Sequence, residues 1–469
     1  MKIYNVSKKI DGLGNSDFDY EAVYASGYSA GYDDGYASVR CYKNEYLTIE
    51  ALEDGAFTLT NDKDNWSGFT RLNGGRWEEV SSGVSIYNLL EGDVVEVKGY
   101  IGGDWIFTPN FNLSLKSKVY GNFLSVRDGD NFTAGTDEAV YACLEYRRGT
   151  FTNSKGLVDA SNLVLPGENP IYRNMFSGCT SLTLPPKLPA TILGHAAYYG
   201  MFDGCTSLTE APELPATATT YDCYYRMFQG CTSLTEAPEL PATILSRRCY
   251  YRMFGNCSSI TAPPELPAKE LAEKCYEAMF KGCESLTEAP ELPVTTLADG
   301  CYSSMFQGCT SLTEAPELPA TTLAVGCYGG MFWGCTSLTK APELPVTTLA
   351  DGCYNSMFQA CTSLTEAPEL PAKELTERCY LYMFYGCTSL TSAPELPATN
   401  PAYSCYQRMF YGCTNLNRVV CLAAEGTENG FEVWLSGVSP TGIFYKHPDA
   451  VWPSGASGIP YGWTVVDAE

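Results

Sequence analysis

The stretch MFQGCTSLTEAPELPATTLAVGCYGG, from Met305 to Gly330, is one copy of a unit that recurs almost unchanged every 26 residues. The period is clearest in one column of cysteines: Cys179, Cys205, Cys231, Cys257, Cys283, Cys309, Cys335, Cys361, Cys387 and Cys413. A fixed period of roughly 20 to 50 residues is the signature of repeats that stack into a solenoid. We therefore expect each unit to contact mainly its two neighbours.

The apolar residues inside one unit predict a short extended segment followed by a helix. After Cys309, three apolar residues follow at a spacing of three among prolines, and the prolines limit any strand to about two or three residues. Leu323, Cys327 and Met331 then lie four apart, which is typical of the buried stripe of a two-turn helix. Residues 172–416 are therefore expected to form an α/β solenoid.

The sequence on either side of the array differs in character. Residues 46–118 alternate apolar and polar residues between turn signals, which predicts a small β-sandwich-like domain. Residues 119–171 repeat parts of the unit at a slipped spacing and are expected to form an N-terminal cap with a degenerate repeat. Residues 417–469, which are rich in tryptophan, glycine and proline, are expected to form the C-terminal cap.

Residues 1–45 form a separate N-terminal segment with tyrosines four apart and glycines between them: Tyr20, Tyr24, Tyr28, Tyr32 and Tyr36. This spacing places neighbours on one side of a helix. Such a helical segment would anchor the protein in a larger assembly or join copies of it into a homo-oligomer. A flexible linker is the alternative, because three glycines disfavour a helix by about 3 kcal/mol.

The 21 cysteines predict buried thiols rather than a disulfide scaffold. Eighteen of them lie in two columns of the repeat. Ala197 and Ile171 occupy the second column in the first units, and these are replacements for a buried apolar residue, not for half of a bridge. Disulfides or metal binding are the alternative, but no CxxC pair occurs, so we expect no zinc site.

The formal net charge of −24 disfavours nucleic acid and anionic membrane surfaces as partners and keeps a long repetitive surface soluble. The segment MKIYNVSKKIDGLGNSDFDY has no apolar run typical of a secretory leader. No stretch of about 18 apolar residues is present, so we expect no membrane insertion. Synthesis in a reducing cytoplasm is the resulting expectation.

Signals of catalysis are weak. The two histidines, His195 and His447, have no recognisable nucleophile or orienting group near them in the sequence. No phosphate-binding glycine motif occurs either. We therefore expect a protein that is not an enzyme and that has no cofactor and no metal.

Comparison of the copies indicates where a binding surface would lie. The apolar columns barely change, whereas the two residues between Tyr and Met, and the residue after Phe, change freely. The candidate ligand-binding residues at these positions are Tyr225, Arg226, Tyr251, Arg252, Trp333, Tyr382, Tyr385, Arg408 and Tyr411. Tyrosine, tryptophan and arginine are the residue types that anchor interfaces. Neutral drift on a solvated helix face is the alternative.

Constant glutamate columns are expected on the other face of the repeats. One contains Glu213, Glu239, Glu265, Glu291, Glu317, Glu343, Glu369 and Glu395. A solvated acidic strip kept by recent duplication is the simpler interpretation. Binding of a basic partner or of divalent cations is the alternative, although single carboxylate rows without an Asp/Asn cage disfavour a tight calcium site.

The pattern CxxLxxA…LPxxxL…CYxxMFxGC over roughly residues 140–420 resembles the BspA-like (Treponema pallidum-type) leucine-rich repeat family. The GYxxGY segment and the SGIPxGWTVVD ending also resemble proteins of gut Bacteroidales and their phages and prophages. The resemblance implies an adhesion or recognition protein that binds a host-surface glycan or protein.

A second expectation concerns the particle or cell that carries this recognition protein. We expect a component of a phage virion, in a tail or capsid fibre, made in the bacterial cytoplasm and held to other virion proteins through residues 1–45. A bacterial cell-surface adhesin is the alternative.

Overall fold

The computed structural model describes residues 45–61, 66–101, 109–131, 149–165, 172–424 and 430–468. By its internal contacts the chain divides into Met1–Cys41 and Tyr42–Glu469, and the described residues belong to the second unit. The N-terminal helical segment expected for residues 1–45 thus lies outside the described residues, apart from residue 45. In the described part of the chain, no helix has the length and apolarity needed to cross a membrane.

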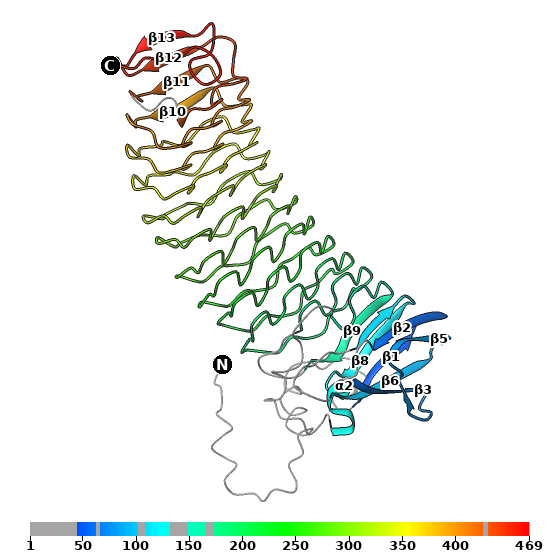
Figure 1. The fold of residues 1–469 in the computed structure, drawn as a ribbon. Coiled ribbons are helices and arrows are strands. Elements are labelled where there is room, and N and C mark those ends of the chain that lie inside the picture. The colour runs from blue at the N-terminus through cyan, green and yellow to red at the C-terminus, as the bar shows by residue number, and fades with distance from the viewer. Residues whose placement is uncertain are drawn as a thin grey trace, which may run out of the picture. The chain divides into compact units, whose positions relative to one another are not determined.

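Two sheets form the region before the repeats (Figure 1). The larger has the order β4-β3-β6-β1-β8-β9, with β4 (Glu78–Glu79), β3 (Trp66–Leu72), β6 (Val94–Ile101), β1 (Leu47–Ala51), β8 (Ser117–Asn122) and β9 (Leu157–Val164). The smaller has the order β5-β2-β7, with β5 (Gly83–Leu89), β2 (Gly55–Asn61) and β7 (Asn110–Leu113). Alternating burial along β2 and β3 reflects the period of two that the sequence shows there.

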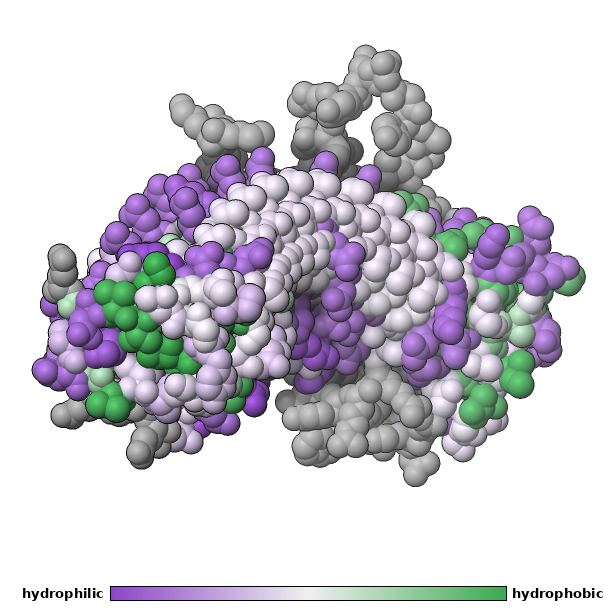
Figure 2. Space-filling model, turned by 90° about the horizontal axis from the view of Figure 1, so that it is seen from above, coloured by the Kyte–Doolittle hydropathy of each residue, from purple (hydrophilic) through white to green (hydrophobic). Residues whose placement is uncertain are grey.

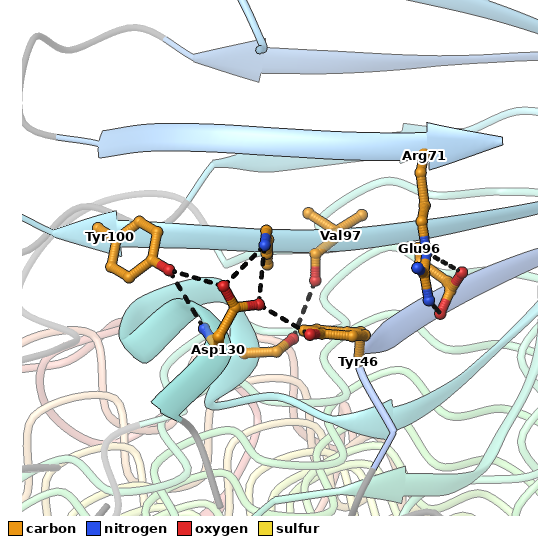
Figure 3. Close-up of polar contacts among 8 residues, drawn as sticks. Tyr46, Arg71, Glu96, Val97, Tyr100 and Asp130 are labelled. Atoms are coloured by element: carbon orange, nitrogen blue, oxygen red, sulfur yellow. Dashed lines mark hydrogen bonds and ion pairs between the residues drawn. The ribbon is translucent and has the colours of Figure 1, made fainter. Parts of the chain in front are cut away.

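A short helical turn is tied to the larger sheet by a polar network (Figure 3). The turn consists of α2 (Ser125–Asp128) and η3 (Gly129–Asn131). The Asp130 carboxylate accepts hydrogen bonds from Lys98 at 2.7 and 2.9 Å and from the Tyr46 hydroxyl at 2.8 Å. These donors hold the pKa of Asp130 below its usual value, with the Lys98 bond as the largest cause.

The repeats contain no α-helix in the described residues, so the helical half of the expected α/β solenoid is wrong. The segment around Met331 is a run of turns in which alternate N–H groups bond in different directions. The N–H of Met331 donates to the carbonyl of Tyr328 in its own turn at 3.1 Å. The next N–H, that of Phe332, donates to Met357 of the following repeat at 2.9 Å. A helix would keep both bonds within one segment, whereas this arrangement joins neighbouring rungs.

The spacing of four comes from consecutive four-residue turns and not from a helical stripe. In the copy around Met331, Gly326, Gly330 and Gly334 have positive φ angles of 59°, 62° and 76°. Side chains other than glycine occupy the middle one of these positions in other copies, also with positive φ: Arg226, Arg252, Ala278, Ser304, Ser356, Tyr382 and Arg408. A left-handed residue at every fourth position reverses the direction of the chain within each turn. Residues four apart therefore lie on the same side of the segment.

Aromatic ladders fill the core of the stacked repeats. One phenylalanine from each repeat stacks on the next, with ring centroids 5.5–5.9 Å apart from Phe111 to Phe410. A parallel tyrosine ladder runs from Tyr172 to Tyr406 at 5.5–6.4 Å. Both ladders are buried, so the invariant columns of the sequence are core.

The expectation of buried thiols is confirmed for the nineteen cysteines in the described part of the chain, since all are free and buried. The first column has a further role that the sequence did not indicate. Each of its ten thiols donates a hydrogen bond of 3.0–3.2 Å to the phenylalanine carbonyl of the preceding repeat. These cysteines are therefore polar links between rungs as well as apolar filling.

The two ends of the array are closed by different devices. At the first end, Phe111 of β7 stacks on Phe151, so the phenylalanine ladder begins inside the β-rich region. At the other end, Trp434 is fully buried and its ring lies 6.2 Å from that of Phe410. A parallel sheet accompanies this end: β10 (Ser392–Leu396), β11 (Arg418–Cys421), β12 (Ile443–Lys446) and β13 (Thr464–Asp467).

Candidate recognition face

We call the three columns that differ between copies the variable face. Its first two columns are the residues between Tyr and Met of each repeat, such as Tyr225 and Arg226, and its third is the residue after Phe, such as Trp333. The nine candidate side chains are exposed or half-buried, while the Tyr, Met and Phe beside them are buried. They lie on turns rather than on the outer stripe of a helix, because the segment folds as consecutive turns.

Along the stacked repeats, the flank that faces the viewer in Figure 2 is near-white and purple. Residues of intermediate and hydrophilic character therefore make up this flank.

The first candidates form a stack with arginines against it. The rings of Tyr225 and Tyr251 are parallel and 4.6 Å apart. Tyr199 covers the other side of Tyr225 at 4.5 Å. Arg226 and Arg252 lie over the rings beside them at 5.4 and 5.5 Å. Burial raises the pKa of Tyr225 to about 12, which agrees with a ring held between neighbours.

A second group of candidates lies further along the array. Tyr385 stacks on Tyr411 at 4.9 Å and meets Tyr382 at 5.9 Å in a tilted arrangement. Arg408 donates a hydrogen bond of 2.9 Å to the Tyr382 hydroxyl. The structure thus joins these four residues, while Tyr225, Arg226, Tyr251 and Arg252 form a separate group.

Trp333 stands apart from both groups. Its side chain is 39% exposed, and it takes part in none of the ring pairs found among the described residues. It borders a hollow of about 520 Å³, whose lining also includes Asp351, Asn355 and Glu377. Of the six aromatic candidates, Trp333 is therefore the one whose ring contacts no other aromatic ring among the described residues.

Several contributors were missed by sequence reasoning. Arg173 lies 4.0 Å over the ring of Tyr199, and Arg248 makes a bidentate pair with Asp222 at 3.0 Å for both contacts. Arg248 also donates to the hydroxyl of Tyr221. The signal was present in the sequence as tyrosine and arginine in corresponding positions of adjacent copies, which stacking brings together.

The acidic columns lie at the surface. Glu314, Lys340 and Glu366 are neighbours on successive rungs through isolated bridges, so a lysine separates two glutamates there. No cluster of three or more His, Cys, Asp or Glu residues in the described ranges is placed to hold a metal ion.

Stacked repeats with a constant buried core define the class of this chain, a repeat protein. The family profile described as BspA type Leucine rich repeat region matches residues 150–287 and 299–425 in six copies, together more than half of the chain. The chain belongs to the BspA-type leucine-rich repeat family. No curated protein and no solved structure gives a match to it.

Proposed function

We propose that this chain is a non-enzymatic adhesion or recognition protein whose repeat solenoid binds a glycan or protein on a host surface through the variable face. Membership of the BspA-type family supports adhesion and recognition. The observation that carries the proposal is the contrast between a nearly invariant buried core and an exposed Trp333 beside an open hollow. Tryptophan is enriched at interfaces, where its large ring is buried when a partner binds.

Weak contacts on several rungs would add up on such a face. The candidate residues are spread over many repeats, whose rings repeat at 5.5–5.9 Å in the core. Rigid spacing lets one contact raise the effective concentration of the next. A ligand that itself repeats, such as a surface polysaccharide or a dense surface protein, suits this arrangement.

For the carrier, we propose a phage virion component and, with equal support from the family, a bacterial surface adhesin. The resemblance of the GYxxGY and SGIPxGWTVVD segments to phage proteins supports the first. Mass spectrometry of purified virions and of cell envelopes separates the two, because the protein would be found in only one of these fractions. Tail or capsid genes beside its gene would agree with the virion.

Attachment of the purified full chain to a panel of gut Bacteroidales cells tests recognition. The test variant replaces Trp333, Tyr385 and Tyr411 of the variable face by serine. A matched control replaces three exposed glutamates, Glu239, Glu317 and Glu343, by glutamine. We expect the first variant to lose at least tenfold in attachment and the control to retain it. Equal attachment by both would contradict the proposal, and release of sugar from the cells would contradict its non-enzymatic part.

A further inference from the structure

The hollow beside Trp333 exists because the variable face becomes small in three successive repeats. The first two columns there carry Ser303-Ser304, Gly329-Gly330 and Asn355-Ser356, where earlier repeats carry Tyr225-Arg226 and Tyr251-Arg252. All six small residues line the hollow. The missing tyrosine and arginine side chains account for the open space of about 520 Å³.

The chain path places different chemistry on the two sides of this floor. Along each rung the chain passes first the column of Val325, Asp351 and Glu377, then the floor, then the column of Trp333. One rim is therefore charged and polar, and the other is the exposed indole. A Cβ built on Gly330 would lie 3.9 Å from the indole Cε3, so the floor backbone runs close to the ring.

Several polar groups at the charged rim keep unused hydrogen-bonding capacity. One Asp351 oxygen accepts the Glu377 N–H at 3.2 Å. The side-chain oxygen Oδ1 of Asn355 accepts a hydrogen bond of 2.7 Å from the Ser356 hydroxyl. In the described part of the chain, no protein partner is found for the second Asp351 carboxylate oxygen or for the side-chain nitrogen Nδ2 of Asn355. The lining of the hollow thus includes an unpaired acceptor on Asp351 and an unpaired donor on Asn355.

The guanidinium of Arg378 adds a cation to the same rim. Its Nε lies 3.4 Å from Glu377, and its side chain is 55% exposed. The rim therefore carries two carboxylates and one guanidinium, and the whole chain carries a net charge of −24. A polyanionic ligand would be repelled, and a lipid would find only Val325 and Trp333 as apolar lining.

From this geometry we propose that the Trp333 hollow binds a neutral saccharide. Sugar hydroxyls both donate and accept hydrogen bonds. They can donate to the carboxylates, accept from the guanidinium, and do both with the carboxamide and serine groups of the rim and floor. The C–H-bearing face of a sugar ring packs on an aromatic face, and Trp333 is the aromatic side chain in the lining. The inference deepens the proposed recognition function and rests on it.

The site extends over several rungs, so the ligand is an oligosaccharide rather than one enclosed sugar. The lining runs from Ser303 through Gly329 and Asn355 to Glu377, which belong to four successive repeats. The hollow is open at its rims, since Val325 is 54% exposed and Trp333 is 39% exposed. A chain of sugars lying across the rungs matches this open, elongated floor.

Binding of the full chain to arrayed oligosaccharides tests the site. The probes are neutral oligomers of glucose, mannose, galactose and N-acetylglucosamine, with uronic acid oligomers for comparison. We expect at least one neutral oligomer to bind, with its affinity then measured by calorimetry. Failure of every neutral oligomer, or binding of the uronic acid oligomers alone, would overturn the proposal.

Three variants locate the bound sugar. Trp333→Ala removes the ring, and Ser303→Tyr fills the floor with the residue that the same column carries at positions 225 and 251. Gln359→Ala changes the same column as Trp333 one repeat later, outside the lining. We expect at least a tenfold loss of affinity for each of the first two and less than a twofold change for the third. Unchanged affinity in Trp333→Ala and Ser303→Tyr would place the sugar elsewhere.

Cell attachment of the same variants keeps the two proposals distinct. Attachment that is lost in Trp333→Ala supports the hollow as the site used on cells. Attachment that persists in Trp333→Ala and Ser303→Tyr leaves the recognition function standing and overturns the hollow. Because Trp333 is partly exposed, Trp333→Ala should melt at a temperature close to that of the unmodified chain. Such a melt shows that the variant is folded.

Discussion

The thiol of Cys309 donates a hydrogen bond of 3.2 Å to the carbonyl oxygen of Phe280, which belongs to the preceding repeat. That carbonyl also accepts the backbone N–H of Cys283 at 3.0 Å, so two donors share one acceptor. Ser154 makes the same contact at the start of the array, where its hydroxyl donates to Phe111 at 2.7 Å. A hydroxyl can therefore replace the thiol in this column.

Serine is expected to replace Cys309 with less loss of stability than alanine. Cys309→Ser keeps a donor for Phe280 and should cost under about 1 kcal/mol, whereas Cys309→Ala removes both the donor and the sulfur volume and should cost about 1–3 kcal/mol. Urea unfolding of the full chain measures the difference.

The second cysteine column gives the opposite order and serves as the control. Ala197 occupies this column in an early repeat and is fully buried there. Cys327→Ala should therefore be milder than Cys327→Ser, which would bury a hydroxyl in a column made for apolar atoms. The same order in both columns would show that the thiol hydrogen bond adds nothing.

Gly334→Ala is expected to lower the free energy of unfolding by about 1 kcal/mol. The φ of 76° at Gly334 is left-handed, and a Cβ there would meet other atoms no closer than 3.8 Å. The loss would thus come from the backbone alone. Gly255→Ala is the control, because Gly255 lacks a positive φ and its added Cβ would make ordinary contacts.

Ala360 provides the reverse substitution in the same column. It has a φ of 58°, where neighbouring repeats carry glycine at positions 334 and 386. Ala360→Gly should leave stability unchanged or raise it by up to about 0.5 kcal/mol, since relief of strain is offset by greater entropy of the unfolded chain. Denaturation midpoints of the three variants test the series, and a marked loss in Ala360→Gly would contradict it.

The buried thiols are expected to stay unreactive in the folded protein well above neutral pH. Burial raises the pKa of Cys179 and of Cys335 to about 12, and thiolate is the reactive form. Alkylation at pH 8 to about 9 should modify these columns only after denaturant is added. A chain with Cys41→Ser and Cys143→Ser restricts the measurement to the nineteen described cysteines, and rapid labelling of the native chain would contradict the expectation.

Asp130 is expected to make stability fall in acid. Its pKa is lowered in the folded state by donors from Lys98 and Tyr46, so its contribution is present above the ordinary value of 3.8 and is lost as pH falls through the lower folded value. The unmodified chain should therefore melt above Asp130→Asn at neutral pH, and the gap should close below about pH 3.8. Glu79→Gln, at an exposed position, is the control, and a gap independent of pH would refute the assignment.

Much of the array could be predicted from residue identities, because the repeats of one chain can be compared with one another position by position. Columns that never change, such as those of Phe332 and Tyr328, are buried ladders, as a constant apolar residue suggests. The candidates in the variable columns, such as Tyr225 and Trp333, lie at the surface, as free variation suggests. The helix was wrong because residues spaced by four lie on one side both in a helix and in consecutive turns. The left-handed backbone at positions such as Ser304 and Tyr382, and the hydrogen bonds to the next rung, distinguish the two.

The candidate site was predicted only as a set of variable positions. Sequence reasoning placed Tyr225, Tyr251 and Trp333 together as aromatic residues on one face. Stacking separates them, since Tyr225 is covered by rings on both sides while Trp333 borders open space. Small residues such as Gly329 did not indicate a binding site in the sequence. The hollow forms because neighbouring rungs lack large side chains there.

The sequence by itself determined the repeat, its family and the residues of its core, because a period of 26 forces equivalent residues into register. Tertiary structure alone decided how that core is joined, since hydrogen bonds such as that from Cys309 to Phe280 link residues 29 positions apart in neighbouring rungs. It also decided which surface residues are free. Contacts between rungs occupy the tyrosines and arginines of the face, and they leave Trp333 beside an empty floor.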